Sequence, residues 1–265
     1  SQGGRLRLNA PVEEILIKDN KAIGVRLEGG EEIASDIVVS NADSMWGYER
    51  LLPEGKRKRW TSGKISKVAF SMSLFLWYFG TDKQYDDVDH HSIILGPRYK
   101  ELLIDIFDRK VLADDFSLYL YRPTASDPSM APEGCDSFYV LSPVPHLEAD
   151  VDWSVQAEPY RKKIEAKLEE TLLPGLSQHI ATSKIMTPVD FKDRLNAPFG
   201  AAFGPEPRMF QSAWFRAHNR SEEVENLFLV GAGTHPGAGV PSVVTSAKLL
   251  DDLVPHGDAW AKTNA

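Results

Sequence analysis

A strand, a glycine-rich loop and a helix follow one another near the end of the chain, and this order constrains the fold most. The apolar run 226–230 enters the loop 231–239, after which apolar residues recur at helical spacing to Val254. Small residues let backbone N–H groups approach a flat or anionic ligand, and the helix N-terminus favours negative charge. Pro241 suits a first helical turn. The motif predicts a phosphate- or flavin-binding loop, with a tight structural turn as the alternative.

This loop differs from the dinucleotide fingerprint G-x-G-x-x-G. Its glycines are spaced Gly231-x-Gly233-x-x-x-Gly237, and the 265-residue chain ends 26 residues after Gly239. That remainder is too short for the roughly 30-residue βαβ unit and its acidic ribose ligand. We therefore expect the strand before the loop to join a sheet that begins elsewhere.

The first 43 residues have the pattern of a sheet. Polar and apolar residues alternate, as in half-buried strands, over four segments. These segments are 5–8, 11–17, 22–27 and 32–33. The dipeptides Asp19-Asn20 and Gly29-Gly30 predict tight hairpin turns because they favour positive φ. The apolar run 36–40 predicts a short buried strand. The result is a small antiparallel meander followed by one buried strand.

The middle of the chain mixes strands and helices. Strand patterns cover 67–79, 116–121 and 137–141. Apolar residues recur at helical spacing in 97–107 and 158–173. The absence of a regular βαβ rhythm favours an α+β domain.

Composition narrows the class of protein. The net charge of −8 argues against a general nucleic-acid binder. The single cysteine, Cys135, cannot form an internal disulfide, which fits a reducing cytoplasm. The longest apolar run, 71–79, is shorter than the roughly 20 residues of a membrane-spanning helix. The chain opens at Ser1 without an initiator Met and soon reaches strand-like alternation, so we expect it to begin within a domain.

Basic and histidine residues offer weaker signals. The run 56–59, Lys-Arg-Lys-Arg, precedes Trp60. It is either a solvated segment or a contact for anionic lipid, where each basic residue gains about 1 kcal/mol and Trp favours the interface. His90 and His91 lack partners at metal-ligand spacing, so we expect no metal site. His235 is expected to brace the glycine loop through a hydrogen bond.

The string 226–241, Asn-Leu-Phe-Leu-Val-Gly-Ala-Gly-Thr-His-Pro-Gly-Ala-Gly-Val-Pro, resembles the C-terminal flavin motif of bacterial-type phytoene desaturases. Other stretches resemble this family in the same order, from about Gly3 to about Leu253. They are 8–12, 40–43, 96–99, 115–120, 131–135, 142–147 and 211–216. By this resemblance the chain is the C-terminal half of such a protein.

The resemblance implies a fold of class α/β plus α+β. It is the FAD/NAD(P)-binding, amine-oxidase-like flavoprotein fold with an inserted mixed-sheet substrate domain. Residues 1–45 and 210–255 are expected in the FAD-binding domain, 46–209 in the substrate and membrane-associated domain, and 256–265 in a tail. The fold is expected to be incomplete, without the N-terminal dinucleotide-binding unit, so that this chain alone binds FAD weakly or not at all and is inactive.

The resemblance also implies the cofactor, FAD, and its contacts. The backbone of Val12 is expected to meet the adenine, and the glycine loop to follow the pyrophosphate, the ribityl chain and the isoalloxazine. The expected loop residues are Gly231, Ala232, Gly233, Thr234, Gly237, Ala238, Gly239, Val240 and Pro241. Many members of the wider superfamily carry an acidic residue at the position of Ala232, so contacts there would come from backbone donors.

The reaction implied is stepwise desaturation of phytoene towards lycopene in carotenoid biosynthesis, by an oxidoreductase acting on CH–CH bonds. A hydrocarbon has no polar group that side chains can bind. The protein must therefore position the substrate and leave the redox chemistry to the cofactor. We identify no catalytic residue. Trp214 and Phe215 are candidates to line the substrate path, with core packing as the alternative. The expected partners are phytoene, related carotenoids and a membrane surface, without nucleic acid, in the cytoplasm as a peripheral membrane protein.

Other functions fit the same pattern. Within the family they are another carotenoid desaturase, a carotenoid isomerase or a hydroxycarotenoid dehydrogenase. The Gly-Thr-His-Pro-Gly-Ala-Gly sequence of the loop disfavours an amine or protoporphyrinogen oxidase. A non-catalytic lipid-binding remnant is the alternative from a different class.

Overall fold

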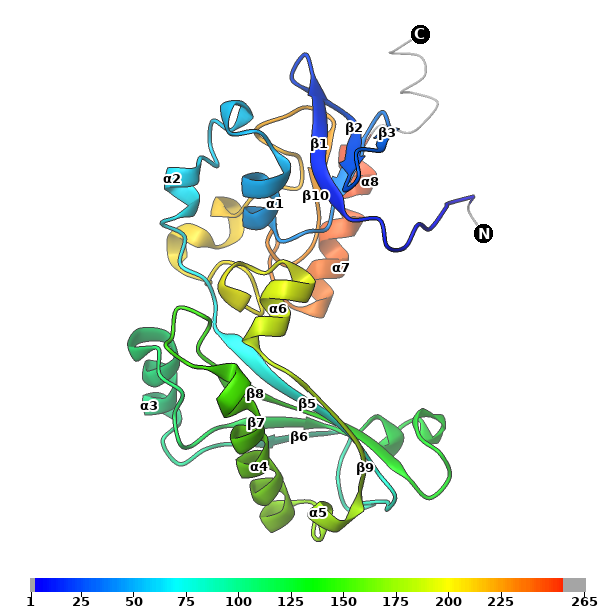
Figure 1. Ribbon diagram of the computed structural model, residues 1–265, viewed down its shortest axis with the longest axis vertical. Helices are drawn as coiled ribbons and strands as arrows, with labels where there is room; N and C mark the ends of the chain where they lie inside the picture. Colours follow the sequence, from blue (N-terminus) through cyan, green and yellow to red (C-terminus); the bar gives the residue numbers. More distant parts are fainter. Residues whose placement is uncertain (1–2, 255–265) are drawn as a thin grey trace. The chain divides into compact units, whose positions relative to one another are not determined.

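The computed structural model describes residues 3–254, which divide into two compact units (Figure 1). Unit 1 contains the described residues up to Phe70 and those from Phe203 onward, and unit 2 is Ser71–Ala202. Residues 46–70 and 203–209, expected in the substrate domain, therefore lie in unit 1. The expected tail, 256–265, lies outside the described residues.

Unit 1 begins with the predicted antiparallel meander. Its strands are β1 (Val12–Lys18), β2 (Lys21–Leu27) and β3 (Glu32–Ala34), in the order β1-β2-β3. Asp19 and Asn20, between β1 and β2, have φ values of 48° and 63°. Such a pair of positive φ values matches the right-handed twist of a two-residue hairpin, so the predicted turn is confirmed.

The predicted strand at 5–8 is wrong. These residues form no regular element, and Leu6 and Leu8 are 86% and 72% exposed. Arg7 is held by its side chain instead, since it donates hydrogen bonds of 2.7 and 2.6 Å to the Glu31 carboxylate. Alternation of polar and apolar residues over four positions specifies a strand only where a neighbouring strand supplies backbone hydrogen bonds.

A parallel pair joins the two ends of unit 1. Strand β4 (Val38–Ser40) lies beside β10 (Leu227–Leu229), with Leu227 opposite Val38. The strand before the glycine loop therefore joins a sheet that begins elsewhere in the chain, as predicted. The helices of unit 1 are α1 (Ser44–Leu51), α2 (Ser62–Ile65), α7 (Val240–Lys248) and α8 (Leu250–Leu253).

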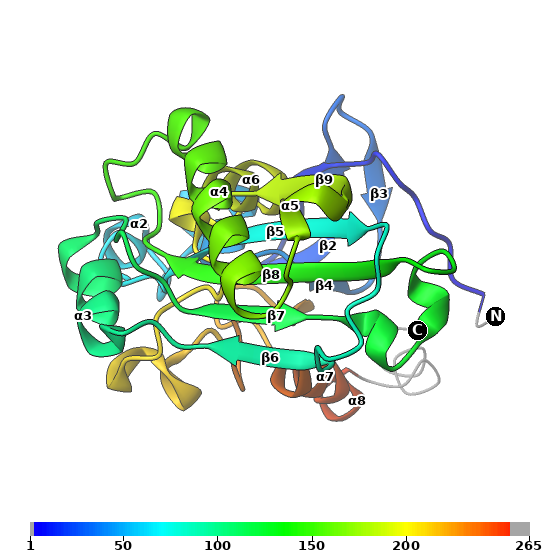
Figure 2. The ribbon, with the colours of Figure 1, turned by 90° about the horizontal axis from the view of Figure 1, so that it is seen from below.

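Unit 2 is built on a five-stranded antiparallel sheet in the order β6-β7-β8-β5-β9 (Figure 2). The strands are β5 (Ser73–Thr81), β6 (His91–Ile94), β7 (Leu118–Tyr121), β8 (Asp136–Val144) and β9 (Ile180–Met186). The helices are α3 (Tyr99–Ile104), α4 (Trp153–Thr171), α5 (Leu176–His179) and α6 (Pro188–Leu195). Helix α4 lies across one face of the sheet.

The core of unit 2 lies between the sheet and α4. Phe75, Trp77 and Phe79 alternate along β5 and pack in one cluster with Ile164 and Leu168 of α4. All five side chains are almost fully buried. Burial of aromatic and aliphatic side chains of this size is the main stabilising contribution in such a layer.

Several element boundaries differ from the sequence prediction, most of all those of α4 and β5. Helix α4 begins five residues before the expected start at 158, because the Asp152 side chain caps it by accepting from Ser154 N over 2.9 Å. The strand expected at 67–79 is β5, which begins only at Ser73.

The two ends of unit 2 are tied to each other. The Ala202 N–H donates to the Met72 carbonyl over 3.0 Å, and the Ser73 hydroxyl donates to the Gly200 carbonyl over 2.5 Å. The unit is thus closed where the chain enters and leaves it.

Candidate functional site

Two loops meet at the carboxyl edge of the parallel pair β4 and β10. Segment 41–43 leaves β4, and the glycine loop 231–239 leaves β10. The Val230 N–H donates to the Ser40 carbonyl over 3.0 Å, which carries the pairing to the start of the loop. Open α/β sheets bind ligands at this edge, so the two segments together form the candidate site.

The first two loop glycines pack closely against the start of α1. Gly231 has φ +107°, and a Cβ there would lie 2.6 Å from Oδ1 of Asn41. A Cβ on Gly233 would overlap the Ser44 hydroxyl and lie 3.0 Å from Ser44 N. The Ser44 hydroxyl donates to the Gly233 carbonyl over 2.9 Å. These two glycines therefore fix the shape of the loop by packing on protein.

Arg216 links the loop to the segment before it. Its guanidinium donates to the Ala232 carbonyl over 2.8 Å and to the Pro205 carbonyl over 3.2 Å. Burial lowers the pKa of Arg216, and the negative charge of Asp43 acts in the opposite direction. Within the described range 3–254, both of these partners are backbone carbonyl oxygens, so the buried guanidinium acts as a structural clamp.

Asp43 ends segment 41–43 and caps α1. Its carboxylate accepts from Met45 N over 2.9 Å and from Trp46 N over 3.1 Å. Burial raises the pKa of the Asp43 carboxyl, although these two N–H groups and the charge of Arg216 lower it. The cap fixes α1 where it meets the glycine loop.

The open part of the site is the start of α7. Gly239 has φ +103°, and a Cβ there would meet no heavy atom within 4 Å. Gly239, Val240 and Pro241 are exposed, Ala238 is half-buried, and no side chain among the described residues caps the first turn of α7. Uncapped N–H groups at a helix N-terminus favour an anionic or electron-rich group. This part of the loop therefore fits a flavin.

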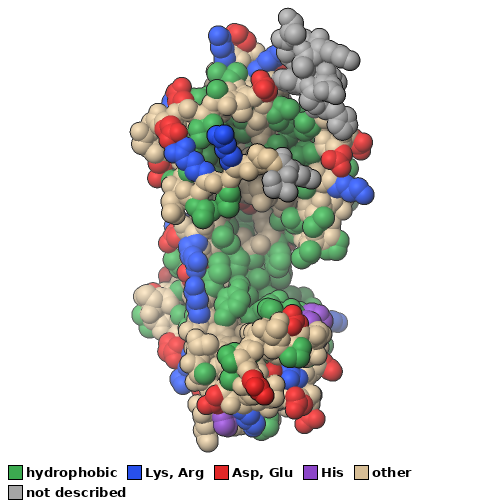
Figure 3. Space-filling model, turned by 90° about the vertical axis from the view of Figure 1, so that its right-hand side faces the viewer, with side chains coloured by type: hydrophobic (Ala, Val, Ile, Leu, Met, Phe, Trp, Pro, Cys, Tyr) green, Lys and Arg blue, Asp and Glu red, His purple; other side chains and the backbone are tan. Residues whose placement is uncertain are grey.

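Apolar residues remain exposed around this edge. Val240 and Val244 of α7 are 79% and 64% exposed, and Val39 of β4 is 49% exposed. Figure 3 views the molecule from the side on which α7 lies in Figure 1, and hydrophobic side chains are visible on that face. Parallel sheets in α/β proteins are normally covered on both faces, so this surface suits further packing.

His235 braces the loop through its backbone rather than its ring. Its N–H donates to the Ala217 carbonyl over 3.1 Å. The Thr234 hydroxyl adds a buried hydrogen bond of 3.0 Å to the Gly231 carbonyl. The buried Nδ1 of His235 has no hydrogen-bond partner among the described residues. That nitrogen is a polar group available to a ligand or water.

The other predicted contacts lie in different places. Val12 pairs with Leu27 at the start of β1, in the meander of unit 1. Its contact with adenine stays a prediction. Trp214 and Phe215 are 71% and 46% exposed. The alternative prediction, that both side chains pack in a hydrophobic core, is therefore wrong.

The basic run at 56–59 is held through its backbone and Arg57, while the side chains of Lys56 and Lys58 are exposed. Arg57 and Trp60 are 8% and 4% exposed. The buried Glu223 carboxylate accepts from the N–H groups of Lys58, Arg59 and Trp60 over 2.5, 2.8 and 2.6 Å. Trp60 therefore cannot insert into a bilayer from this position, as the lipid-contact alternative required.

Sequence reasoning missed a tyrosine-lined sheet face in unit 2. Tyr78, Tyr119, Tyr121 and Tyr139 lie on adjacent strands, with ring-centroid separations of 5.0–5.8 Å along the row. Tyr139 lies opposite both Tyr78 and Tyr121 in the strand register. Side chains alternate across a strand, so this face is opposite to the one that packs on α4. Tyrosines two residues apart in β7 were the available signal.

The two histidines at 90–91 have local partners. Nδ1 of His91 lies 2.7 Å from the Tyr119 hydroxyl, and Nδ1 of His90 contacts the Ser126 hydroxyl. Within residues 3–254, no group of His, Cys, Asp and Glu side chains is arranged to hold a metal ion. None of the helices in the same range is both long and apolar enough to cross a membrane.

Comparison with known families identifies the class. The chain belongs to the family of flavin containing amine oxidoreductases, whose model matches residues 1–249. Within it, the chain is similar to bacterial phytoene desaturases. It is 54% identical over 260 residues to the neurosporene-forming phytoene desaturase of Rhodobacter capsulatus, covering 96% of this chain and 50% of that protein. It is 48% identical over 256 residues to the lycopene-forming enzyme of Pseudescherichia vulneris, covering 95% and 51%.

Solved structures share the fold. An oxidoreductase from Methanosarcina mazei matches with a TM-score of 0.57 at 18% identity, covering 92% of this chain and 49% of that one. A putrescine oxidase variant matches with a TM-score of 0.56 at 10% identity, covering 93% and 48%. The predicted amine-oxidase-like flavoprotein fold and the flavin cofactor, FAD, are confirmed at the level of the family. The chain spans about half the length of the curated relatives it matches.

Proposed function

We propose that the native protein is an FAD-dependent oxidoreductase that desaturates phytoene towards lycopene. The observation that carries this proposal is the 54% identity, over 260 residues, to a phytoene desaturase. The glycine loop supports it, because its open end presents backbone donors and no competing cap. The neurosporene-forming and lycopene-forming relatives are 54% and 48% identical to this chain. Because these identities are similar, product analysis is needed to determine which carotene is the end product.

The residues of this chain that hold the flavin are those of the glycine loop and the first turn of α7, together with the backbone of Val12. The loop contacts proposed are Gly231, Ala232, Gly233, Thr234, Gly237, Ala238, Gly239, Val240 and Pro241. When bound, FAD would supply the acceptor for the hydride lost from a C–H bond, while the neighbouring carbon loses a proton as the single bond between them becomes double. The clamp of Arg216 on Ala232 keeps the loop backbone in one conformation for this contact.

For the substrate, the tyrosine row of unit 2 offers an extended aromatic surface. Burial raises the pKa of Tyr139 to about 12, so its phenol is neutral at physiological pH. Leu76 and Leu141 lie on the same face, because each pairs with the other and Leu141 also pairs with Tyr119. Lys184 of β9 pairs with Tyr78 and borders this face at one end. The aromatic and aliphatic side chains of the row itself suit a long hydrocarbon, which gains from burial of apolar area. Trp214 and Phe215 of unit 1 remain candidates for a second apolar contact.

Product analysis tests the proposal. The native protein, purified with its flavin, is incubated with phytoene in detergent micelles, and the carotenes are separated and identified by their absorption. Loss of phytoene with growth of longer-wavelength products is expected. Geometric isomers without new double bonds would identify an isomerase instead, and unchanged phytoene would overturn the proposal.

The substrate surface has its own test. Tyr139→Lys places a charge in the tyrosine row, so we expect a KM for phytoene raised at least tenfold with unchanged flavin content. Tyr99→Lys, at an exposed position on α3, is the matched control. Equal effects of the two changes would remove the tyrosine row from the proposal.

A further inference from the structure

Four large apolar side chains are exposed together in the segment 209–215 of unit 1. Met209, Phe210, Trp214 and Phe215 are 73%, 70%, 71% and 46% exposed. They come from two short helical turns, and the rings of Phe210 and Phe215 pack edge to face with centroids 5.5 Å apart. A cluster of this kind marks an interaction surface rather than ordinary surface scatter.

Positive charge gathers beside this segment. Residues 55–69 contain six Lys and Arg and no Asp or Glu, although the whole chain has a net charge of −8. Arg57 is buried, and Arg59 forms an ion pair of 3.1 Å with Glu222. In the part of the chain that the structure describes, Lys64 and Lys67 pair with no carboxylate. Their charge is free for an external anion.

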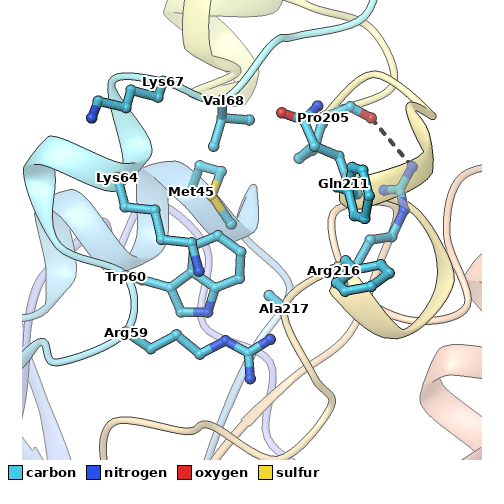
Figure 4. Close-up of a pocket in the computed structure, with 12 residues that line it drawn as sticks. Met45, Arg59, Trp60, Lys64, Lys67, Val68, Pro205, Gln211, Arg216 and Ala217 are labelled. Carbon is cyan, nitrogen blue, oxygen red and sulfur yellow. Dashed lines mark hydrogen bonds between the residues drawn. The ribbon is translucent and has the colours of Figure 1, made fainter.

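A pocket of about 300 Å³ lies between the basic and the apolar residues (Figure 4). Figure 4 shows Arg59, Lys64 and Lys67 along one side, with Pro205 and Arg216 on the other. Met45, Val68, Phe210 and Phe215 supply apolar walls. The Nζ of Lys64 lies 4.3 Å from the centroid of the Trp60 ring, which holds this ammonium at the pocket edge.

We propose that this surface docks on a bilayer of anionic lipid, with a lipid phosphate held at the pocket by Lys64 and Lys67. The docking surface consists of Lys64, Lys67, Met209, Phe210, Trp214 and Phe215. Segment 209–215 enters the boundary between headgroups and acyl chains, where Trp and Phe side chains are favoured, and the two lysines meet the headgroup phosphates.

The combination of charges and apolar residues selects this partner. A nucleic acid would contact the lysines but would leave Met209 and Phe210 in water. A zwitterionic bilayer would accept the apolar residues but would not attract the lysines. The inference rests on the proposed function in one respect: a substrate dissolved in lipid requires the protein to contact a bilayer. It also moves the predicted lipid contact from the run 56–59 to Lys64, Lys67 and the segment 209–215.

Vesicle binding tests the docking surface. The native protein, purified with its flavin, is sedimented with vesicles of phosphatidylcholine, with and without phosphatidylglycerol. Lys64→Ser with Lys67→Ser is expected to lower the partition coefficient on anionic vesicles roughly tenfold to thirtyfold, from about 1 kcal/mol per basic residue. The loss should shrink as salt is raised. Lys100→Ser with Lys192→Ser removes the same charge from exposed positions of unit 2 and is the matched control.

A second variant separates insertion from charge. Met209→Ser with Phe210→Ser is expected to lower binding at least tenfold at high salt, where the lysines contribute little. Flavin content and circular dichroism confirm that each variant is folded. Desaturation of phytoene in micelles is measured in parallel, so that failure of the proposed function is distinguished from failure of docking.

Three results of the vesicle assays would overturn the docking proposal. They are unchanged vesicle binding by both double variants, an equal loss in the Lys100 and Lys192 control, and insensitivity of binding to phosphatidylglycerol. Displacement from vesicles by glycerol phosphate, beyond that by chloride at equal ionic strength, would also overturn it and make the pocket a site for a soluble phosphate.

Discussion

The Ser44 hydroxyl donates a hydrogen bond of 2.9 Å to the Gly233 carbonyl and joins residues 189 positions apart. Ser44 is 1% exposed, so water does not compete for this bond. It fixes the glycine loop on the first turn of α1, next to the parallel pair. The loop conformation in unit 1 therefore depends on a contact that neither segment can make alone.

Ser44→Ala is expected to lower the free energy of unfolding by about 1 kcal/mol, because one buried hydrogen bond is lost. Gly233→Ala should cost more, since its Cβ would lie 3.0 Å from Ser44 N. In the double variant the hydroxyl overlap disappears but the backbone contact remains, so the two effects should be less than additive. Urea unfolding measures all three. Full additivity of the two losses in unfolding free energy would contradict the close packing of Gly233 on Ser44. Ser66→Ala, at an exposed position, is the control.

Asp43→Asn tests the buried carboxyl beside the site. The folded-state pKa of Asp43 lies above the ordinary 3.8, so the native state binds this proton more tightly than the unfolded state does. The wild-type free energy of unfolding should therefore decline as pH rises from the ordinary pKa through the raised one, and then level off. Asn keeps the oxygen that caps Met45 and Trp46 but does not titrate, so the variant should lack this decline.

The measurement is the free energy of unfolding by urea at several pH values between acid and neutral. Asp43→Ala, which loses the cap, should be less stable than Asp43→Asn by about 1 kcal/mol at neutral pH. Asp36→Asn, at an exposed position, serves as control. Parallel profiles for wild type and Asp43→Asn would rule out the raised pKa.

Glu223→Gln is expected to destabilise unit 1 by about 2 kcal/mol. The carboxylate accepts from three consecutive backbone N–H groups at 58–60, whereas the amide nitrogen of Gln cannot accept. Hydrogen exchange of these three amides should accelerate in the variant. Glu225→Gln, whose carboxylate is 65% exposed, should change neither quantity. Unaltered exchange at 58–60 in Glu223→Gln would be the contrary result.

Asp136→Asn should destabilise unit 2 by about 3–5 kcal/mol, because it removes the buried carboxylate partner of Arg122 and leaves its ion pair with the exposed Asp86. The Asp136 carboxylate accepts from Arg122 Nε over 2.9 Å, from Thr124 Oγ1 over 2.5 Å and from Tyr85 N over 2.8 Å. The midpoint of thermal unfolding is the measurement, with exposed Asp193→Asn as control. A midpoint within one degree or so of the wild type would show that the network contributes little.

The elements predicted best are those with strong local signals. The glycine loop, the turn at Asp19-Asn20 and the amphipathic face of α4 were all visible in sequence, because periodicity and turn chemistry act over a few residues. The partner of β10 could be inferred only as lying elsewhere. Its identity as β4 depends on pairing across most of the chain, which no local pattern encodes.

The failures have tertiary causes. Strand β9 carries Ala, Thr, Ser and Lys in its centre, and it is a strand because β5 supplies a ladder. The run 56–59 has the sequence of a solvated surface segment, yet Arg57 is buried and the neighbouring backbone binds Glu223, far along the chain. The tyrosine row exists only once strand order brings β5, β7 and β8 side by side.

The contact between Ala202 and Met72 has an evolutionary consequence. Because the chain enters and leaves unit 2 at adjacent backbone positions, the 71–202 segment resembles a cassette with matched ends. Recombination between relatives could exchange this cassette, and with it the tyrosine row, while the glycine loop and its parallel strands stay intact. Under the proposed function, such an exchange would alter the substrate surface and leave the proposed flavin loop unchanged.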